Sequence, residues 1–504
     1  MDNTLYYLSH MARRGLRRMC LACAAITLAA ILSSGKTADR PIIIKGTVTD
    51  QDGKGIAGVV VNNGREFCKT DRHGAWQLST DTTASKFVSI STPREYALPQ
   101  CDGIATAFYI PISEAVAHPT RNTFRLSRRD SVSNRFYYIA ISDPQILNAH
   151  DMKRWRNETV ASIMRTAAQL RKTGEVVGMT LGDVVFDNMA IYPQYVQSIR
   201  NHRMTFFQCI GNHDFEKAYA DLHNSPEGAA QYAERMYGRY FGPVNYSFNI
   251  GQAHIVTIKN INYRGGCRYE EEITDEDLRW LEHDLSYVPK DMVVILNMHA
   301  PGWNAMEPID NILNAERLKE ILAPYEAHIF AGHTHFFENV EVTPQLYQHN
   351  IAAACGAWWT CNINRDGAPN GYMVVTVDGK KLRWKYKSAN SKADVQMRVY
   401  KPGEFGTQKD YIVANVWEWD PHCRVVWYED GKYRGAMQRF ADNDEAFLKT
   451  KPRKPQMAKT GHLFRARPTS KKYRYVKVIF INRFGETFTW KWENRNNRPF
   501  LLDK

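Results

Sequence analysis

The sequence has no long hydrophobic run, few cysteines and no glycine-rich phosphate-binding loop. Its N-terminal apolar stretch, residues 19–32, has 14 residues, whereas a membrane-spanning helix needs about 20. A Walker-type loop and a G-x-S-x-G nucleophile motif are both missing, which argues against P-loop and serine-hydrolase chemistry. What remains is a chain of 504 residues, 44% hydrophobic and 24% charged, which is typical of a globular protein with about two to four domains.

The first 38 residues have the pattern of a secretory signal peptide. Four arginines precede the apolar stretch and small residues follow it, as in a basic n-region, a short h-region and a cleavage region. We therefore expect an exported protein, periplasmic or secreted, with no transmembrane span once residues 1–38 are removed. The alternatives are a retained anchor and a lipoprotein site at Cys23, although the apolar run follows Cys23 instead of preceding it.

Seven cysteines lie beyond residue 38, and none of them forms a CxxC pair. A zinc site built on thiolates is therefore not expected. An odd number of scattered cysteines in a large exported chain permits one or two disulfides but does not describe a disulfide scaffold. The candidate pairs are Cys68 with Cys101 and Cys355 with Cys361.

Positive charge is concentrated at the C-terminal end of the chain. The formal net charge is +13, and residues 446–504 alone hold 16 Lys and Arg against 3 Asp and Glu. The sequence between residue 38 and this segment has a net charge of −4. Nucleic acid is therefore not an expected partner of the protein body, and a nucleic-acid platform would be confined to the C-terminal segment.

Three regions with different residue patterns follow the signal peptide. Residues 41–127 alternate short β-branched runs with turn signals such as DQDGKG and NNG, which predicts a small β-sandwich. Residues 135–350 alternate apolar strands with amphipathic helices, for example over 155–174 and 274–288, which predicts an α/β domain. Residues 351–504 return to β-type patterning and predict a mostly β accessory domain.

Polar side chains follow five apolar runs of the central region, at the point where each run ends. The runs are FYYIAIS, EVVGMTL, TFFQCI, MVVILN and AHIFA. The side chains that follow them are Asp143 and Gln145, then Asp183, then Asn212, His213 and Asp214, then His299, and finally His333 and His335. Because the loops at the carboxyl ends of strands line the crevice of an open α/β sheet, these side chains are expected to converge.

The converging groups offer only oxygen and nitrogen ligands. This combination of carboxylate, carboxamide and imidazole groups suits divalent first-row metals such as Zn, Mn or Fe, and the number of groups suits two ions. A single Asp after a strand is usually a turn or a helix cap. GNHD and GHTH are more specific, because several such residues after a buried strand have little structural use.

The series DPQ, GD, GNHD, a lone His and GHTH, over residues 137–335, resembles the calcineurin-like metallophosphoesterase superfamily. The flanking regions resemble its exported bacterial branch, which has a transthyretin-like N-terminal β-sandwich and a C-terminal accessory domain. The resemblance implies an α/β core of two packed sheets flanked by helices, which hydrolyses a phosphate mono- or diester through a hydroxide that bridges two divalent ions. Carried over residue by residue, it places Asp143, Gln145, Asp183 and His335 on one ion, and Asp183, Asn212, His299 and His333 on the other.

Gln145 departs from the family pattern, which usually has a histidine at that position. A carboxamide oxygen is a weaker donor to zinc-like metals than imidazole is. Gln145 is therefore expected to weaken the first site, to favour Mn or Mg, or to lie outside the ligand set. His213, which the resemblance does not assign to a metal, is the expected general acid for the leaving alkoxide, with Asp214 orienting its ring.

The expected partner is a small phosphoester substrate, and the β modules are candidates for association with envelope polymers or glycans. Candidates for substrate contacts are His150, Asp151, Asp187, Asn188, Trp358, Trp359 and Asn362. Aromatic residues in such a segment are more often part of the core. Two other functions stay open: a binding protein with a degenerate metal site, which Gln145 favours, and a nuclease that uses the basic C-terminal segment.

Overall fold

The structure is a computed structural model, and it describes residues 42–82, 84–223, 230–305, 311–470 and 472–494. Pro41–Lys504 forms one compact unit, and the predicted signal peptide, residues 1–38, lies outside the described residues. Within the described ranges, no helix combines the length and the apolar character needed to cross a membrane. The seven described cysteines are free, so neither of the two permitted disulfides is formed.

The N-terminal module consists of two small sheets, as expected for a β-sandwich. One sheet has the strand order β4-β1-β7, and the other has the order β3-β2-β5-β6. The strands are β1 (Ile42–Asp50), β2 (Val60–Asn62), β3 (Phe67–Lys69), β4 (Ala75–Thr80), β5 (Phe87–Ser91), β6 (Tyr109–Pro111) and β7 (Thr123–Leu126), with helix α1 (Ile112–Ala117) after β6. Val48 and Val61 are fully buried between them and belong to the same hydrophobic cluster as core residues such as Phe207.

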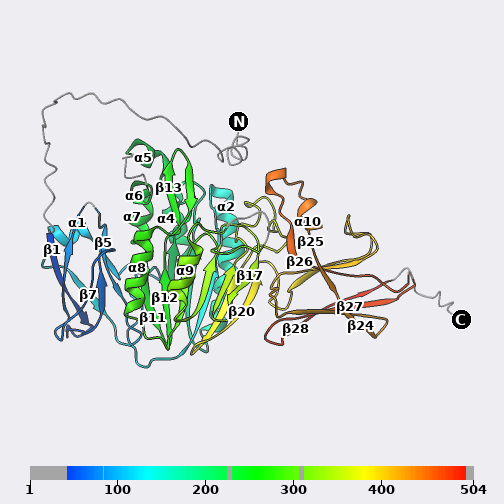
Figure 1. The fold of residues 1–504 in the computed structure, drawn as a ribbon, viewed down its shortest axis with the longest axis horizontal. Coiled ribbons are helices and arrows are strands. Elements are labelled where there is room, and N and C mark those ends of the chain that lie inside the picture. Colours follow the sequence, from blue (N-terminus) through cyan, green and yellow to red (C-terminus); the bar gives the residue numbers. More distant parts are fainter. Residues whose placement is uncertain (1–41, 83, 224–229, 306–310, 471, 495–504) are drawn as a thin grey trace, which may run out of the picture. The chain divides into compact units, whose positions relative to one another are not determined.

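The central region contains two larger sheets, each built around parallel strands (Figure 1). In the first sheet, β10, β9 and β8 are parallel, and in the second, β12, β15, β16 and β18 are parallel. The first sheet has the order β10 (Thr205–Cys209), β9 (Glu175–Leu181), β8 (Arg135–Ile141), β19 (Gly371–Asp378) and β20 (Lys381–Ser388). The second has the order β11 (Tyr246–Ile250), β12 (Ala253–Thr257), β15 (Val293–Asn297), β16 (Glu326–Ala331), β18 (Leu346–Asn350) and β17 (Glu338–Thr343).

The two sheets pack against each other through large side chains. The ring centroids of Tyr138 on β8 and Phe330 on β16 lie 5.4 Å apart, and the Tyr138 hydroxyl donates to Oδ1 of Asn297 on β15. Alternate residues of the same strands face the opposite way and belong to a second cluster, which includes Leu296 and helical residues. Each strand is thus buried on both faces, which explains the uninterrupted apolar runs in the sequence.

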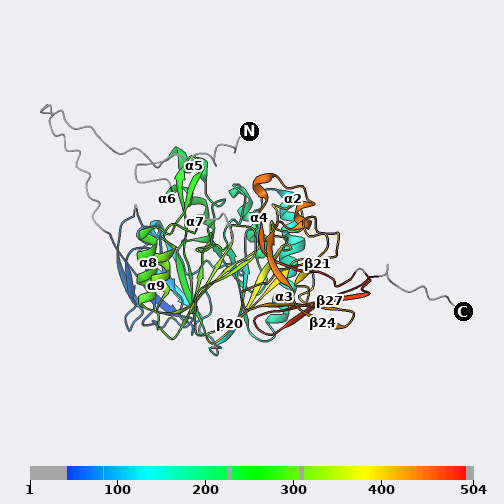
Figure 2. The same cartoon turned by 45° about the vertical axis from the view of Figure 1, so that its right-hand side comes forward.

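Helices cover the outer faces of both sheets (Figures 1 and 2). Leu281 of α8 (Asp275–Ser286) and Leu318 of α9 (Ala315–Leu322) are buried in one cluster with Leu296 of β15. Helix α8 begins after Thr274, whose side chain accepts the backbone N–H of Asp277, as the sequence predicts. The central region also contains α4 (Tyr192–Ile199), α5 (Lys217–Leu222), α6 (Ala230–Ala233), α7 (Arg235–Phe241) and the hairpin β13 (Ile261–Gly265) with β14 (Arg268–Glu271).

The helix expected over residues 155–174 begins earlier than predicted. It starts as α2 (Ala149–Arg154), continues as a π-helical segment over Trp155–Val160 and ends as α3 (Ala161–Leu170). The cap is Asn148, whose side chain accepts two backbone N–H groups of the first turn. The apolar periodicity begins only near Val160, so Asn148 was the one local sign of the true start.

One core sheet extends past the expected domain boundary at residue 350. The C-terminal module has the sheets β21-β22-β26-β25 and β24-β23-β27-β28, but residues 371–388 do not belong to it. They form β19 and β20, and β19 pairs antiparallel with β8 of the core. The residue pattern of a β-hairpin does not depend on which sheet the hairpin joins. The sequence therefore could not show that β19 pairs with β8. The module's elements are β21 (Met397–Tyr400), β22 (Ile412–Val416), β23 (Arg424–Glu429), β24 (Lys432–Ala436), β25 (Gln438–Asp442), α10 (Glu445–Leu448), β26 (Thr460–Ala466), β27 (Tyr475–Ile481) and β28 (Thr487–Glu493).

Candidate metal centre

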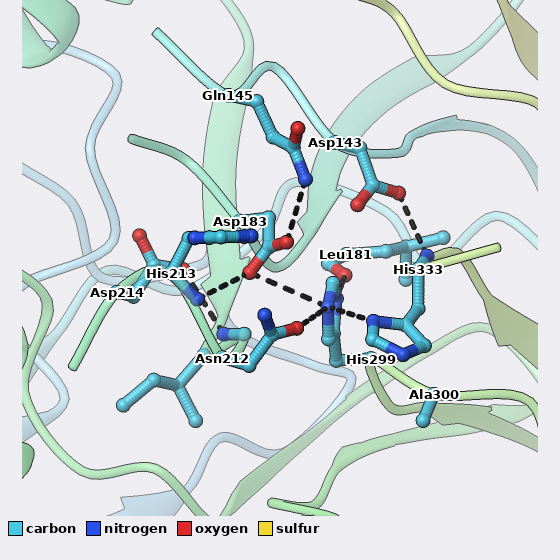
Figure 3. A network of polar contacts seen from close by, with 12 residues as sticks. Asp143, Gln145, Leu181, Asp183, Asn212, His213, Asp214, His299, Ala300 and His333 are labelled. Carbon is cyan, nitrogen blue, oxygen red and sulfur yellow. Dashed lines mark hydrogen bonds and ion pairs between the residues drawn. The ribbon is translucent and has the colours of Figure 1, made fainter. Parts of the chain in front are cut away.

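The five predicted strand ends meet at one edge of the two core sheets (Figure 3). Strands β8, β9, β10, β15 and β16 are followed by Asp143 and Gln145, by Asp183, by Asn212, His213 and Asp214, by His299, and by His333 and His335. Because the strands within each sheet are parallel, their carboxyl ends lie on the same side. The structure therefore brings together the side chains that the sequence singles out, and most of them are buried.

The chain turns sharply at these strand ends. Five of the predicted ligands have a positive φ: Asp143 (46°), Gln145 (41°), Asp183 (50°), His333 (69°) and His335 (56°). A left-handed backbone costs a residue with a side chain on the order of 1–3 kcal/mol, and it persists only where the surrounding structure imposes it. Backbone strain is thus concentrated at the positions that offer the ligand atoms.

Two glycines let the loops approach the carboxylates closely. A Cβ atom on Gly211 would overlap Oδ1 of Asp183, and a Cβ atom on Gly332 would overlap Oδ2 of Asp143. No other residue type fits without moving a carboxylate. The glycines of GNHD and GHTH are therefore explained by the space that two candidate ligands occupy.

His299 is fully buried and presents one ring nitrogen to the site. Its Nδ1 lies 2.8 Å from the carbonyl oxygen of Leu181, so Nδ1 carries the proton and Nε2 is left as an acceptor. Nε2 lies 3.1 Å from Oδ1 of Asn212 and 3.4 Å from Oδ1 of Asp183 (Figure 3). The lone pair of Nε2 thus points at two oxygen acceptors.

His333 is oriented by a residue of the β13–β14 hairpin. Its Nε2 lies 3.0 Å from Oε1 of Glu271, the last residue of β14, so Nε2 donates and Nδ1 is left as an acceptor. Nδ1 lies 3.1 Å from Nε2 of His299. A carboxylate behind an imidazole in this way is the usual support of a metal-binding histidine.

Four potential ligand atoms therefore face one another. They are Nε2 of His299, Nδ1 of His333, Oδ1 of Asn212 and Oδ1 of Asp183. Ligand atoms of Asp183, His299 and His333 lie within 4.8 Å of one another. Lone pairs that converge in a buried site are satisfied by a cation, and this set of donors fits a divalent first-row metal.

Asp143 and His335 mark a second position. Nδ1 of His335 lies 2.9 Å from the carbonyl oxygen of Gly356, which leaves Nε2 as an acceptor 3.5 Å from Oδ1 of Asp143. This Oδ1 is buried and accepts no hydrogen bond from the described residues, whereas Oδ2 accepts the backbone N–H of His333. An unpaired carboxylate oxygen thus faces an imidazole nitrogen in a buried site, and this pair of ligand types fits a second cation.

Gln145 is the predicted ligand whose oxygen does not face the others. Its Nε2 donates to Oδ2 of Asp183 at 2.8 Å (Figure 3), and its Oε1 lies 4.0 Å from Sγ of Cys355. In this arrangement the carboxamide orients the Asp183 carboxylate from outside the ligand set. The departure from histidine thus leaves the two acceptor sets intact.

The surroundings lower the pKa of two carboxyl groups of the site and raise the pKa of a third. Burial raises the pKa of Asp183, but the charges of His299 and His213 outweigh burial and hold the pKa below its ordinary value. Burial lowers the pKa of His299, but Asp183 and Asp143 outweigh burial and raise it to about 9, so a cation at this site competes with a proton on Nε2 of His299. For Asp143, contact with His335 likewise outweighs burial, and the pKa is lowered. Burial and the neighbouring charge of Asp183 raise the pKa of Asp214 to about 7. The two candidate ligands are therefore ionised at neutral pH.

The carboxylate that contacts His213 is Asp187 and not Asp214, which corrects the prediction. Nδ1 of His213 lies 3.1 Å from Oδ2 of Asp187, and Phe186 stacks on the imidazole with ring centroids 4.1 Å apart. The other oxygen of Asp187 lies 2.6 Å from Nζ of Lys217. Asp187 thus lies beside one edge of the His213 ring, and an aromatic ring covers one face.

Asp214 braces two loops instead. Its carboxylate accepts the backbone N–H groups of Gly211 at 3.0 Å, Val184 at 3.2 Å and Val185 at 3.3 Å, and the hydroxyl of Tyr192 at 3.1 Å. The loop after β9 is thereby tied to the loop after β10. Adjacency in sequence to His213 suggested an orienting role, but the two side chains have different partners.

Three further residues complete the site, and the strand-end pattern pointed to none of them. Glu271 orients His333, and Cys355 lies beside Gln145. Asn260 accepts the backbone N–H of His299 at 3.0 Å. Asn260 follows β12, another parallel strand of the second sheet, so the rule of strand ends could have found it. Glu271 and Cys355 come from a hairpin and a distant loop, for which no local signal exists.

Models of three parts of one protein family match the chain. The model of calcineurin-like phosphoesterase matches residues 136–337, and those of its N terminal and C terminal match residues 42–129 and 348–488. The chain belongs to the calcineurin-like phosphoesterase family. Metal-dependent hydrolysis of phosphoesters is therefore the general chemistry of this phosphoesterase, in agreement with its acceptor sets. The C-terminal family segment includes β19 and β20, which complete the core sheet.

No curated protein matches this phosphoesterase. Among solved structures, a dimetal phosphatase from Danio rerio is similar at 14% identity and a TM-score of 0.36, over 50% of this chain and 96% of its own. A 5'-nucleotidase from Candida albicans is similar at 9% identity and a TM-score of 0.33, over 53% of each chain. A metallophosphoesterase from Sphaerobacter thermophilus is similar at 15% identity and a TM-score of 0.21, over 50% of this chain and 88% of its own.

Proposed function

We propose that this phosphoesterase hydrolyses a phosphate monoester or diester at a centre of two divalent ions. The observation that carries the proposal is the presence of two buried acceptor sets at one edge of the core. Asp183, Asn212, His299 and His333 would hold one ion, and Asp143 and His335 the other, and the family pattern shares Asp183 between them. Divalent ions held there would neutralise phosphoryl oxygens and lower the pKa of a coordinated water.

The residues of the chain would perform the remaining tasks. The Leu181 carbonyl and Glu271 keep protons off the ligand nitrogens of His299 and His333. Asp187 lies beside Nδ1 of His213, so Nε2 is the atom that would give a proton to the leaving alkoxide. No covalent intermediate on the protein is required for this reaction.

We further propose that the protein is exported and acts there on a small phosphoester. The support is the sequence of residues 1–38, with its basic residues, short apolar stretch and small residues. Association with envelope polymers or glycans through the two β modules belongs to the same proposal.

The test is reconstitution of activity with metal. Residues 39–504, which include the whole compact unit, are stripped with a chelator and assayed against a panel of phosphate mono- and diesters with Mn, Zn, Fe or Mg. We expect activity to return with a transition metal, and elemental analysis to find about two ions per chain at saturation. Asp183→Asn and His333→Ala should lose metal and activity together, whereas the control His118→Ala, at a half-exposed histidine of the N-terminal module, should keep both.

One outcome would contradict the proposal, and another would replace the small phosphoester with nucleic acid as the substrate. Tight metal binding without hydrolysis of any ester would favour a binding protein with a degenerate site. Hydrolysis confined to nucleic acid, and lost when lysines and arginines beyond residue 446 are neutralised, would favour a nuclease.

A further inference from the structure

Two consecutive tryptophans beside the metal-ligand residues have left-handed backbones. The φ angles of Trp358 and Trp359 are 51° and 58°. Bulky residues rarely adopt this conformation, and two in succession cost stability unless the surroundings impose them. One tryptophan is explained by packing and the other is not.

The segment that carries both tryptophans is bonded to the ligand loops. The backbone N–H of Ala354 donates to the carbonyl oxygen of Ser142 at 2.7 Å, and that of Cys355 donates to the carbonyl oxygen of Asp143 at 3.2 Å. The carbonyl oxygen of Gly356 accepts from Nδ1 of His335. The segment therefore follows the ends of β8 and β16, and its residues form one side of the site.

Trp359 is a core residue. Its side chain is 3% exposed, and its Nε1 donates to the carbonyl oxygen of Pro144 at 2.8 Å. The guanidinium of Arg154 lies 5.2 Å from its ring centroid. These contacts hold the turn after β8, between Asp143 and Gln145, so packing accounts for Trp359.

Trp358 has a different environment. Its ring stacks on the imidazole of His335, with centroids 4.9 Å apart and an interplanar angle of 29°. It is only partly buried, against a small cluster that contains Ile363 and Phe447 of α10. No described residue accepts a hydrogen bond from its Nε1. The strained backbone thus places an indole, partly open to solvent, directly against a candidate metal ligand.

We infer that Trp358 forms a wall of the substrate site and selects phosphoesters whose leaving alcohol carries a flat ring, an inference that rests on the proposed function. A phosphoryl group held between the two acceptor sets lies beside His335, so its ester substituent extends along the surface that Trp358 helps to form. Rings of aryl groups and nucleobases stack on an indole face or edge, whereas a short polyol does not. α10 of the C-terminal module supports the indole from behind, which gives that module a part in substrate selection.

The test compares esters that share the phosphate and differ in the alcohol. Para-nitrophenyl phosphate, a nucleoside monophosphate and glycerol phosphate, or their diester counterparts, are assayed with the metal-supplemented protein. Trp358→Ala should raise KM about tenfold for the two ring-bearing esters, the effect of one lost stacking contact, with little change in kcat. The rise for glycerol phosphate should be much smaller. The ring-bearing ester with the larger change identifies which kind of ring the site prefers.

Matched variants separate this role from a structural one. Trp358→Phe keeps a ring and should retain most of the preference for ring-bearing esters. Tyr433→Ala removes a side chain that is 61% exposed on β24, and KM should stay at the wild-type value for every ester. An equal rise in KM for ring-bearing and ring-free esters in Trp358→Ala would overturn the inference. Failure of the wild-type protein to hydrolyse any ester would contradict the proposed function instead, so the two failures are distinguishable.

Discussion

At the scale of single residues, the surroundings of His213 separate the roles of two nearby carboxylates. Asp187 shares its two oxygens between the His213 ring and the ammonium of Lys217. Asp214 is fully buried and binds backbone N–H groups of the loops after β9 and β10. The first arrangement orients a ring, and the second holds loops in place, so loss of each carboxylate should have a different consequence.

Asp187→Asn should lower kcat about 10- to 100-fold while metal content and stability stay near those of the wild type, because His213 loses the charge that aligns it. The loss should be larger for alkyl esters than for nitrophenyl esters, whose leaving groups need less protonation. Steady-state kinetics on both ester types, with metal analysis of the same samples, checks this expectation.

Asp214→Ala is the matched comparison. It leaves three buried backbone N–H groups without an acceptor, so the free energy of unfolding should fall by about 3 kcal/mol or more and the metals should be lost with it. Normal kcat for alkyl esters in Asp187→Asn would show that Asp187 does not position the ring.

At the scale of elements, the site depends on how each parallel strand ends. The apolar part of each strand is buried between the opposite sheet and the helices, and the first residues beyond it turn sharply into the site. Position 332 requires glycine because its backbone passes close to Asp143, where a Cβ atom would overlap the Asp143 carboxylate.

Gly332→Ala should therefore displace Asp143 and remove the ion that Asp143 and His335 are proposed to hold, while the ion at Asp183 stays bound. The control is Gly53→Ala, at a turn with φ of 81° and open space around the new methyl group. It should lose about 1–2 kcal/mol of stability through backbone strain but bind both ions. Metal titration by calorimetry shows whether one of two binding steps disappears, and two unchanged steps in Gly332→Ala would refute the requirement.

At the scale of the whole molecule, Arg483 of the C-terminal module reaches the core sheets beside a buried histidine pair, with its guanidinium 5.0 Å from the ring centroid of Trp384. Nδ1 of His328 on β16 lies 3.0 Å from Nε2 of His349 on β18, and Trp384 of β20 packs on both rings. Burial and the charge of Arg483 lower the pKa of His328 to about 3. Burial, His328 and Arg483 also hold the pKa of His349 well below its ordinary value.

Acid should therefore destabilise the protein through these rings. A histidine whose pKa is lower in the folded chain binds fewer protons there, so its stabilising effect is complete above pH 6.5 and is lost as the pH falls toward 3. In His328→Phe, the decline of the unfolding free energy with falling pH should be shallower by up to about 1.4 kcal/mol per pH unit between about pH 6 and 4. Urea denaturation across this range measures the slope, and the control His118→Phe should match the wild type. An unchanged slope in His328→Phe would place the acid sensitivity elsewhere.

The five strand ends and the residues that follow them could be predicted from the sequence alone. An apolar run and the polar residue after it are local in sequence, and parallel topology brings the carboxyl ends of such runs together whatever the connecting loops do. The start of α8 is local for the same reason, because Thr274 directly precedes the helix and its side chain accepts the N–H of Asp277, three residues on. These features need no knowledge of distant contacts.

The groups that contact the ligand residues from behind could not be predicted in this way. Glu271 reaches His333 from a separate hairpin, Asp187 takes the place expected for Asp214, and Trp358 arrives on a loop bonded to the end of β8. The pairing of β19 with β8 joins strands more than 200 residues apart. Each of these depends on the packing of segments that are remote in the chain, where sequence periodicity carries no information about the partner.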